Sequence, residues 1–334
     1  MQIVDIRQVE WAGAMELEAH AGGALQPWRL PCALLDFLDF RTRFQAGNPS
    51  GVRLRFASNT RRVRLQVEPV PKDKRWFDLV SDERLAGRVE LLSGDSVVAF
   101  EDLPPGEKIL EIWLNHMYSP VIVHGLQLDD GASFERAPPA KKKRILFHGS
   151  SISHGRGAAG PAEAWPAGAA RLLDLDPVNL GLGGACRLEP AVARVIRDQP
   201  ADFLSFCLGV NVVMGRTHNE RAFRSGVVGF VQIVREKHAL TPLVIQGPIF
   251  CRQAETYADP EQFSLVRCRQ VLREVVECFR KHGDSKIIYG GDLEMLGATE
   301  ENMLCDGVHP GPDGHRLMSR RYTDLVWPRL AALA

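Results

Sequence analysis

The apolar residues of the chain recur with a different period in each half. Between residues 32 and 130 they recur at every second position, for example at Val63, Leu65 and Val67. Such alternation is typical of half-buried antiparallel strands. Because turn segments rich in Gly and Pro separate the runs, such as LPPGEK at 103–108, the pattern predicts an all-β sandwich of the jelly-roll kind.

After residue 143 short apolar strands alternate with amphipathic helices. The predicted strands are 144–149, 178–181, 202–208, 243–247 and 286–290. Between them apolar residues recur with the 3.6-residue period of a helix, as at Phe223, Val227 and Phe230, and a last helix is expected after Gly311. Strands that alternate with helices predict a doubly wound α/β domain, in which helices cover both faces of a parallel sheet of about five strands.

The two apolar patterns predict two domains and a linker. With 334 residues the chain is longer than a typical single core. We expect a β-sandwich domain at 1–137 and an α/β domain at 144–334. The linker at 138–143 lies in RAPPAKKK, where prolines and a lysine run favour an extended, solvated segment.

Composition excludes several classes of function. Lys plus Arg and Asp plus Glu both number 41, so no strong net field would attract nucleic acid or an acidic membrane surface. The seven cysteines show no paired metal-binding spacing, which favours reduced thiols. The first residues do not resemble a signal peptide, and no apolar run approaches the roughly 20 residues of a membrane span. We therefore expect a soluble cytoplasmic protein.

Four short segments carry residues that can take part in catalysis. They are GSSISHG at 149–155, NLGLGG at 179–184, GVN at 209–211 and DGVHP at 306–310. Each follows the end of a predicted strand, and ligands of open α/β sheets gather beyond the carboxyl ends of the strands. The segments supply a serine, a glycine, an asparagine and an Asp/His pair, which are the parts of an acyl-transfer site.

Each segment also has a structural interpretation when it is taken alone. The serine and glycine segments are common in tight turns, and Asn211 is a favoured residue for capping a helix. DGVHP is more specific, because an aspartate three positions before a histidine can hold the imidazole in one tautomer. The agreement of order, spacing and position at strand ends favours one shared site.

These residues resemble the SGNH, or GDSL-like, serine hydrolase superfamily over about residues 144–320. The resemblance implies that Ser151 is the nucleophile, that His309 is the general base and that Asp306 is the acid that orients it. It also implies an oxyanion hole formed by the backbone N–H groups of Ser151 and Gly184 and the side chain of Asn211. This chemistry requires no metal and no organic cofactor.

Two positions depart from the family pattern. Ser150 stands where an aspartate usually precedes the nucleophile, and Val212 stands where an aspartate usually follows Asn211. The sequence is similar to a divergent branch with an N-terminal β-sandwich, whose members include esterases that deacetylate sugars and acyltransferases that modify natural products. We expect an esterase that acts on a small acyl ester, such as an O-acetylated sugar, with water as the acceptor. The alternative is an acyltransferase that uses an alcohol.

Two further hypotheses compete with this one. His148, His154 and His315 suggest a metal site, although they lack a ligand triad with carboxylates at set spacing. The sandwich could instead be a carbohydrate-binding module beside an inactive hydrolase domain. In that case Trp76, Trp113 and Tyr118 would form a sugar-stacking platform, although aromatic residues on strands more often belong to the core.

Overall fold

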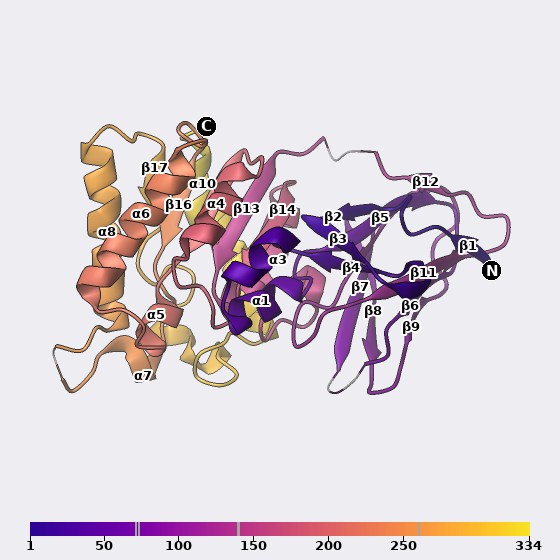
Figure 1. The fold of residues 1–334 in the computed structure, drawn as a ribbon, viewed down its shortest axis with the longest axis horizontal. Helices are drawn as coiled ribbons and strands as arrows, with labels where there is room; N and C mark the ends of the chain where they lie inside the picture. Colours follow the sequence, from indigo (N-terminus) through magenta and orange to yellow (C-terminus); the bar gives the residue numbers. More distant parts are fainter. Residues whose placement is uncertain (71, 73, 139–140, 260) are drawn as a thin grey trace. The chain divides into compact units, whose positions relative to one another are not determined.

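The computed structural model describes residues 1–70, 72, 74–138, 141–259 and 261–334, and they form two compact units (Figure 1). The first unit comprises 1–35, 46–141 and 160–162, and the second comprises 36–45, 142–159 and 163–334. The predicted domain boundaries stay a prediction. Part of the predicted linker, residues 139 and 140, lies outside the described residues.

The first unit consists of two antiparallel sheets, each with six strands among the described residues. One sheet has the order β3 (Glu16–Ala19), β4 (Leu25–Trp28), β11 (Val123–Leu128), β6 (Val63–Val67) and β9 (Val97–Phe100), with β1 (Gln2–Val4) also on β11. The other has the order β12 (Glu135–Arg136), β5 (Arg53–Ser58), β10 (Lys108–Trp113), β7 (Arg75–Ser81) and β8 (Arg84–Leu91), with β2 (Glu10–Ala12) also on β5. The predicted antiparallel β architecture is confirmed.

The core of the first unit contains the alternating residues that predicted its strands. Leu54 and Phe56 of β5 and Val63 and Leu65 of β6 are fully buried in one apolar cluster. The strands before residue 32 were not predicted, because β1 to β4 contain only three or four residues each and are too short to show a period.

Trp113 does not fit an open sugar-stacking platform. Its side chain is 4% exposed, the Arg53 guanidinium lies 4.9 Å from its ring centroid, and its Nε1 donates a hydrogen bond to Glu111 at 3.2 Å. Its ring therefore belongs to the core, as strand aromatics commonly do.

The second unit is built on a parallel sheet with five strands among the described residues. Its order is β14 (Asp176–Gly181), β13 (Arg144–Gly149), β15 (Phe203–Cys207), β16 (Leu243–Gln246) and β17 (Ile287–Tyr289). All five strands were predicted from the apolar runs. In chain order the arrangement is 2-1-3-4-5, the flavodoxin-like topology, so the switch in strand order lies between β13 and β15.

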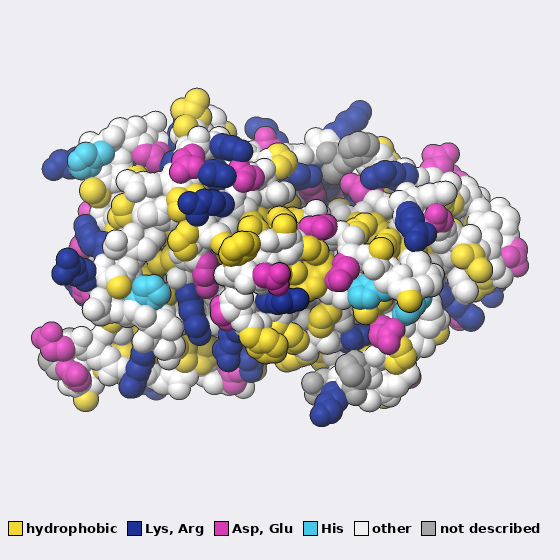
Figure 2. Space-filling view, in the orientation of Figure 1, with side chains coloured by type: hydrophobic (Ala, Val, Ile, Leu, Met, Phe, Trp, Pro, Cys, Tyr) yellow, Lys and Arg dark blue, Asp and Glu magenta, His cyan; other side chains and the backbone are white. Residues whose placement is uncertain are grey.

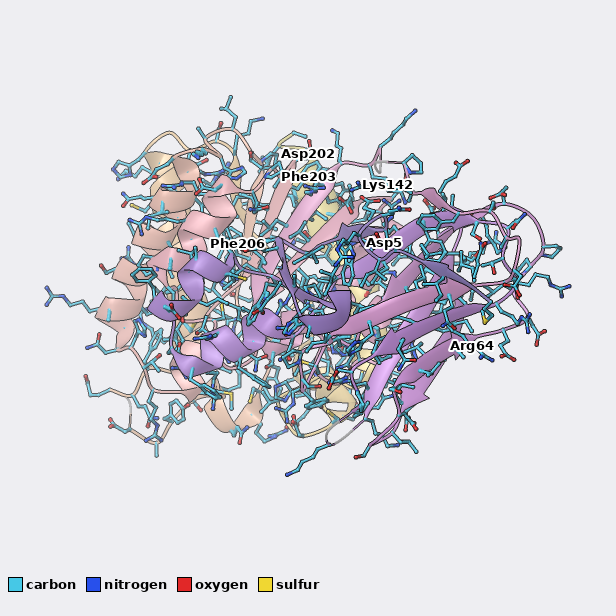
Figure 3. The ribbon with its side chains drawn as sticks, turned by 45° about the vertical axis from the view of Figure 1, so that its right-hand side comes forward. Asp5, Arg64, Lys142, Asp202, Phe203 and Phe206 are labelled. Atoms are coloured by element: carbon cyan, nitrogen blue, oxygen red, sulfur yellow. The ribbon has the colours of Figure 1, made fainter. Side chains whose placement is uncertain are left out.

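Helices cover both faces of this sheet, as expected (Figure 1). One face of the sheet packs on α3 (Trp165–Leu172), α9 (Pro312–Arg321), a π-helical turn (Tyr322–Val326) and α10 (Trp327–Ala331). The opposite face packs on α4 (Pro190–Asp198), α6 (Glu220–Arg235) and α8 (Leu265–Lys281). Phe203 and Phe206, labelled in Figure 3, show why β15 has apolar residues on both faces. Residues three apart on a strand face opposite sides, so Phe203 packs on Trp327 and Phe206 packs on Phe230 of α6.

The shorter elements lie mainly in loops. The short helices are α1 (Phe40–Gly47), α2 (Ser151–His154), α5 (Val210–Met214) and α7 (Arg252–Glu255), and the 3₁₀ turns are Ala21–Gly23, Cys32–Phe37, Pro161–Glu163 and Ala298–Met303. No helix among the described residues has the length and hydropathy needed to cross a bilayer. Figure 2 shows basic and acidic side chains interspersed over the visible face, in line with their equal numbers.

Candidate active site

Ser151 lies at the carboxyl edge of the parallel sheet, two residues after β13 ends. Ser150 caps helix α2, because its Oγ accepts a hydrogen bond from the backbone N–H of Ile152 at 3.3 Å. The helix ends at Gly155, whose φ of 110° few other residues adopt and whose N–H donates to the Ser151 carbonyl at 3.0 Å. Serine and aspartate are both good N-caps, so Ser150 can fill the capping position of the aspartate expected from the family pattern.

The structure brings Ser151, His309 and Asp306 together, although the serine and histidine are 158 positions apart. The Oγ of Ser151 lies 2.8 Å from Nε2 of His309. On the other side of the ring, Nδ1 of His309 lies 2.8 Å from Oδ2 and 3.0 Å from Oδ1 of Asp306. These partners assign the proton to Nδ1 and leave Nε2 free to accept the serine proton.

The surroundings of Asp306 and His309 lower the pKa of both side chains. Partial burial opposes ionisation of Asp306, but hydrogen bonds from the backbone N–H and ring of His309 outweigh it and hold the carboxyl pKa below its usual range. Burial lowers the pKa of His309, and the nearby Arg156 guanidinium lowers it further, while Asp306 opposes the shift. The imidazole is therefore neutral near pH 7, as a general base must be.

Asn211 lines the same cavity as Ser151. Its Oδ1 accepts a hydrogen bond from the backbone N–H of Cys186 at 3.1 Å, which fixes the amide orientation. Within the described residues its Nδ2 has no acceptor. The residue that caps α5 is Gly209, so the alternative interpretation of Asn211 as a helix cap is wrong.

Gly184 lines this cavity too and has a φ of 68°, in the left-handed region that favours glycine. Its loop is tied to α2 by side chains that the sequence analysis had not assigned. Nδ1 of His154 accepts from the N–H of Gly183 at 3.2 Å, while Asn179 accepts from the N–H of Gly181 and donates to the Ser153 carbonyl, both at 2.8 Å. These bonds hold the serine and glycine segments at a set separation.

The three histidines considered as metal ligands contact backbone or sulfur atoms instead. Nδ1 of His148 lies 2.9 Å from the Leu180 carbonyl, and its Nε2 lies 3.5 Å from the Cys186 sulfur. His315 bonds the Trp165 N–H and the Arg156 carbonyl, and burial lowers its pKa to about 4. No group of three or more His, Cys, Asp or Glu residues in the described part of the chain is arranged to hold a metal ion.

The cavity at this site has a volume of about 260 Å³ and lies within the second unit. Besides Ser151, Gly184, Asn211 and His309, its walls include the side chains of Arg41 and Arg187. Sequence reasoning missed both arginines. Arg41 lies in the segment 36–45, which was predicted to belong to the β-sandwich, and no local pattern marks it as part of a site.

Comparison with known proteins identifies the family. A model of the GDSL-like lipase/acylhydrolase family matches residues 142–331, which is more than half of the chain. The chain belongs to this family. It is therefore an enzyme of the GDSL esterase and acyltransferase group, whose members act on acyl substrates and pass the acyl group to water or an alcohol.

Solved structures resemble the whole chain. A salicylyl-acyltransferase, SsfX3, from a tetracycline biosynthetic pathway is 29% identical, with a TM-score of 0.89 over 99% of this chain and 96% of that one. A candidate GDSL-like lipase from Bacteroides ovatus is 20% identical, with a TM-score of 0.80 over 99% and 97%. A family two carbohydrate esterase from Clostridium thermocellum is 16% identical, with a TM-score of 0.67 over 84% and 93%. The last two likenesses show the fold alone. No curated protein sequence matches the chain significantly.

Proposed function

We propose that the enzyme is an esterase that cleaves a small acyl ester through a covalent intermediate on Ser151. The observation that carries the proposal is the 2.8 Å contact between Ser151 Oγ and His309 Nε2, continued by the 2.8 Å contact between His309 and Asp306. A serine hydroxyl is a weak nucleophile until an adjacent base takes its proton. This chain of contacts supplies that base and the carboxylate that orients it.

The first half of the reaction forms the acyl-enzyme. Nε2 of His309 takes the Ser151 proton while Oγ attacks the ester carbonyl, and the resulting imidazolium is stabilised by Asp306. The same proton then passes from His309 to the departing alkoxide, which leaves as an alcohol. In the second half, water attacks the acyl group while His309 takes a proton from it. The bond between Ser151 Oγ and the acyl carbon then breaks, His309 returns the proton to Oγ, and the carboxylic acid is released.

The negative oxygen of each tetrahedral intermediate requires donors that are already in place. Three groups can donate to it, namely the Ser151 N–H in the first turn of α2, the Gly184 N–H and the Asn211 Nδ2. N–H groups in the first turn of a helix have no acceptor within the helix. The fixed orientation of the Asn211 amide, set by Cys186, adds a donor that needs no reorganisation during the reaction.

The size of the cavity supports a small substrate. Ligand sites usually measure roughly 300–1,000 Å³, so about 260 Å³ is at the lower limit of this range. A short or compact acyl group fits this volume. The more specific hypothesis of an O-acetylated sugar depends on the carbohydrate esterases, whose likeness to this chain is one of fold.

A second candidate function is acyl transfer to an alcohol, and the similarity to SsfX3 favours it. That protein is an acyltransferase and resembles this chain over nearly its whole length. The acyl-enzyme would form through the same residues, and only the second acceptor would differ. The two functions are distinguished by giving the enzyme an isotopically labelled activated ester with a panel of alcohols, and then measuring by mass spectrometry how the acyl group divides between acid and new ester.

The proposal is tested by labelling the enzyme with a fluorophosphonate and mapping the adduct by mass spectrometry. We expect the adduct on Ser151 and expect Ser151→Ala to lose both the adduct and the hydrolysis of p-nitrophenyl acetate. Ser153→Ala is the matched control, because Ser153 lies in the same helix but does not line the cavity. Unchanged turnover in Ser151→Ala would refute the proposal.

A further inference from the structure

Two arginines share the cavity with the proposed nucleophile. Arg41 lies at the start of α1, and Arg187 lies in the connection between β14 and α4. Among the described residues that line the cavity they are the only ones with a permanent charge, since His309 is neutral near pH 7. The cavity is therefore cationic, although the chain as a whole has no net charge.

Neither guanidinium has a hydrogen-bond or ion-pair partner in the described part of the chain. The backbone N–H groups of Arg41 and Arg187 donate to the side chains of Asp39 and Glu189. The Nε of Arg187 is buried and has no acceptor among the described residues. A buried polar group that is left unpaired is costly. Because Arg187 lines the cavity, an anion bound there would supply a partner for its guanidinium.

Each arginine lies close to a glycine that lines the cavity. Nη1 of Arg41 lies 2.7 Å from the position that a Cβ on Gly184 would occupy, and Nη2 of Arg187 lies 3.8 Å from the corresponding position on Gly215. Gly215 directly follows α5, the helix that carries Asn211. An anion bound by these guanidinium groups would therefore share the cavity with the ester carbonyl that Ser151 is proposed to attack.

The nearest carboxylates are occupied by other donors. Asp39 accepts hydrogen bonds from the backbone N–H groups of Arg41 and Thr42 and from the Thr42 hydroxyl. Glu189 accepts from the backbone N–H of Arg187 at 3.1 Å, and its burial raises its pKa. Both acids weaken the positive field near Arg187, but neither forms an ion pair with the guanidinium.

We propose that the ester taken by this enzyme carries an anionic group, a carboxylate or a phosphate, that Arg41 and Arg187 bind. The proposal rests on the proposed function of Ser151 and names the substrate class of that same site. Arginine suits this role because its planar fork of N–H groups matches the oxygens of a carboxylate or phosphate. The two arginines are specificity-determining residues, and Ser151 and His309 do the chemistry.

The test compares anionic and neutral esters in matched pairs. One arm has the charge in the acyl group, with mono-p-nitrophenyl succinate against p-nitrophenyl butyrate. The other arms have it in the leaving group, with 4-acetoxybenzoate and 4-acetoxyphenyl phosphate against phenyl acetate. The ratio of kcat/KM for anionic over neutral ester is measured in the wild type, Arg41→Gln and Arg187→Gln, so that differences in intrinsic reactivity cancel.

We expect the ratio to fall by about 10- to 100-fold in each variant for at least one arm, as for the loss of a hydrogen bond to a charged group. The arm that responds shows whether the charge belongs to the acyl group or to the alcohol. Arg43→Gln is the matched control, because Arg43 lies in the same helix, pairs with Asp36 at 3.3 Å and does not line the cavity. In the wild type, about 0.5 M NaCl should also lower the ratio, since salt screens exposed charges.

Three results would overturn this inference. They are an unchanged ratio in both variants, a parallel fall for neutral and anionic esters, and a wild type that turns over only neutral esters. The Ser151→Ala variant distinguishes failure of the proposed function from failure of the anionic-substrate proposal. Turnover that persists in that variant removes the proposed function itself, whereas turnover that needs Ser151 but ignores both arginines removes only the anionic substrate.

Discussion

Arg55 and Arg88 of the first unit differ in their pairing from the two cavity arginines of the second unit, and the contrast supports the proposed anionic ligand. In the first unit Arg55 lies 2.7 Å from both Glu10 and Glu111, and Arg88 contacts both oxygens of Asp78 at 2.6 and 3.0 Å. At the cavity of the second unit, Arg41 and Arg187 have no such partner within the described residues. A scaffold satisfies its polar groups internally, whereas a binding site leaves some of them for the ligand.

The sheets of the two units differ in a related way. Antiparallel strands end alternately at opposite edges of a sheet, so their connecting loops are divided between two edges. Parallel strands all end at one edge, so β13, β14 and β15 place Ser151, Gly184 and Asn211 at the same edge. This geometry explains why distant segments build one site in the second unit.

Replacement of Asp306 should give the largest loss of function among the changes that leave Ser151 intact. In Asp306→Asn the ring of His309 loses the carboxylate that fixes its tautomer and stabilises its cation. We expect kcat for p-nitrophenyl acetate to fall by on the order of 10⁴ with the fold retained. Asp313→Asn, an exposed change near the start of α9, is the control and should leave kcat unchanged. Equal activity in both variants would remove Asp306 from the mechanism.

Substitutions of Asn211 and Asn219 should have different effects, one on catalysis and the other on stability. Asn211→Ala removes the proposed oxyanion donor, and we expect kcat to fall by about 10²- to 10³-fold with little change in stability. Asn219→Ala removes the N-cap of α6, whose side chain accepts from the Ala222 N–H at 2.9 Å. It should cost about 1 kcal/mol of unfolding free energy and leave kcat unchanged. Steady-state kinetics and urea unfolding of both variants check the prediction, and the reverse pattern would contradict it.

A change in the first unit should affect stability instead of activity. Arg55→Met leaves Glu10 and Glu111 without their shared cation in a largely buried setting. We expect the free energy of unfolding to fall by about 1–3 kcal/mol. Denaturant titration measures this change, while kcat/KM of the folded protein should stay within about twofold of the wild type. A loss of kcat/KM as large as that of Asn211→Ala would show that the two units do not separate these roles.

The pH profile should give the smallest effect. The pKa of His309 is lowered, chiefly by burial, so its neutral, active form persists at more acidic pH than for a free imidazole. Activity is therefore lost as the pH falls through that lowered pKa, and we expect the acidic limb of kcat/KM to lie below pH 6.5. In Arg156→Gln the limb should move upward, because a nearby positive charge is removed. A limb that stays in place would show that Arg156 does not influence the base.

The main elements of the second unit could be predicted from the amino-acid pattern. Apolar runs predicted all five parallel strands, because strands that are buried on both faces consist mostly of apolar residues. The same reasoning placed Ser151, Gly184 and Asn211 after strand ends and His309 before a helix. The Asp/His spacing also predicted the contact between Asp306 and His309, because that contact lies within one short loop.

The distant residues that complete the cavity were identified from the folded chain alone. Residues 36–45 lie within the β half in sequence, between β4 and β5, but belong to the second unit, and they bring Arg41 to Gly184. His154 and Asn179 likewise acquire their positioning roles from contacts between separate segments. The periodicity of apolar residues indicates whether a side chain faces the core, because it depends on the local geometry of the helix or strand. It does not identify partners that lie far away in the chain, since those depend on how the whole unit packs.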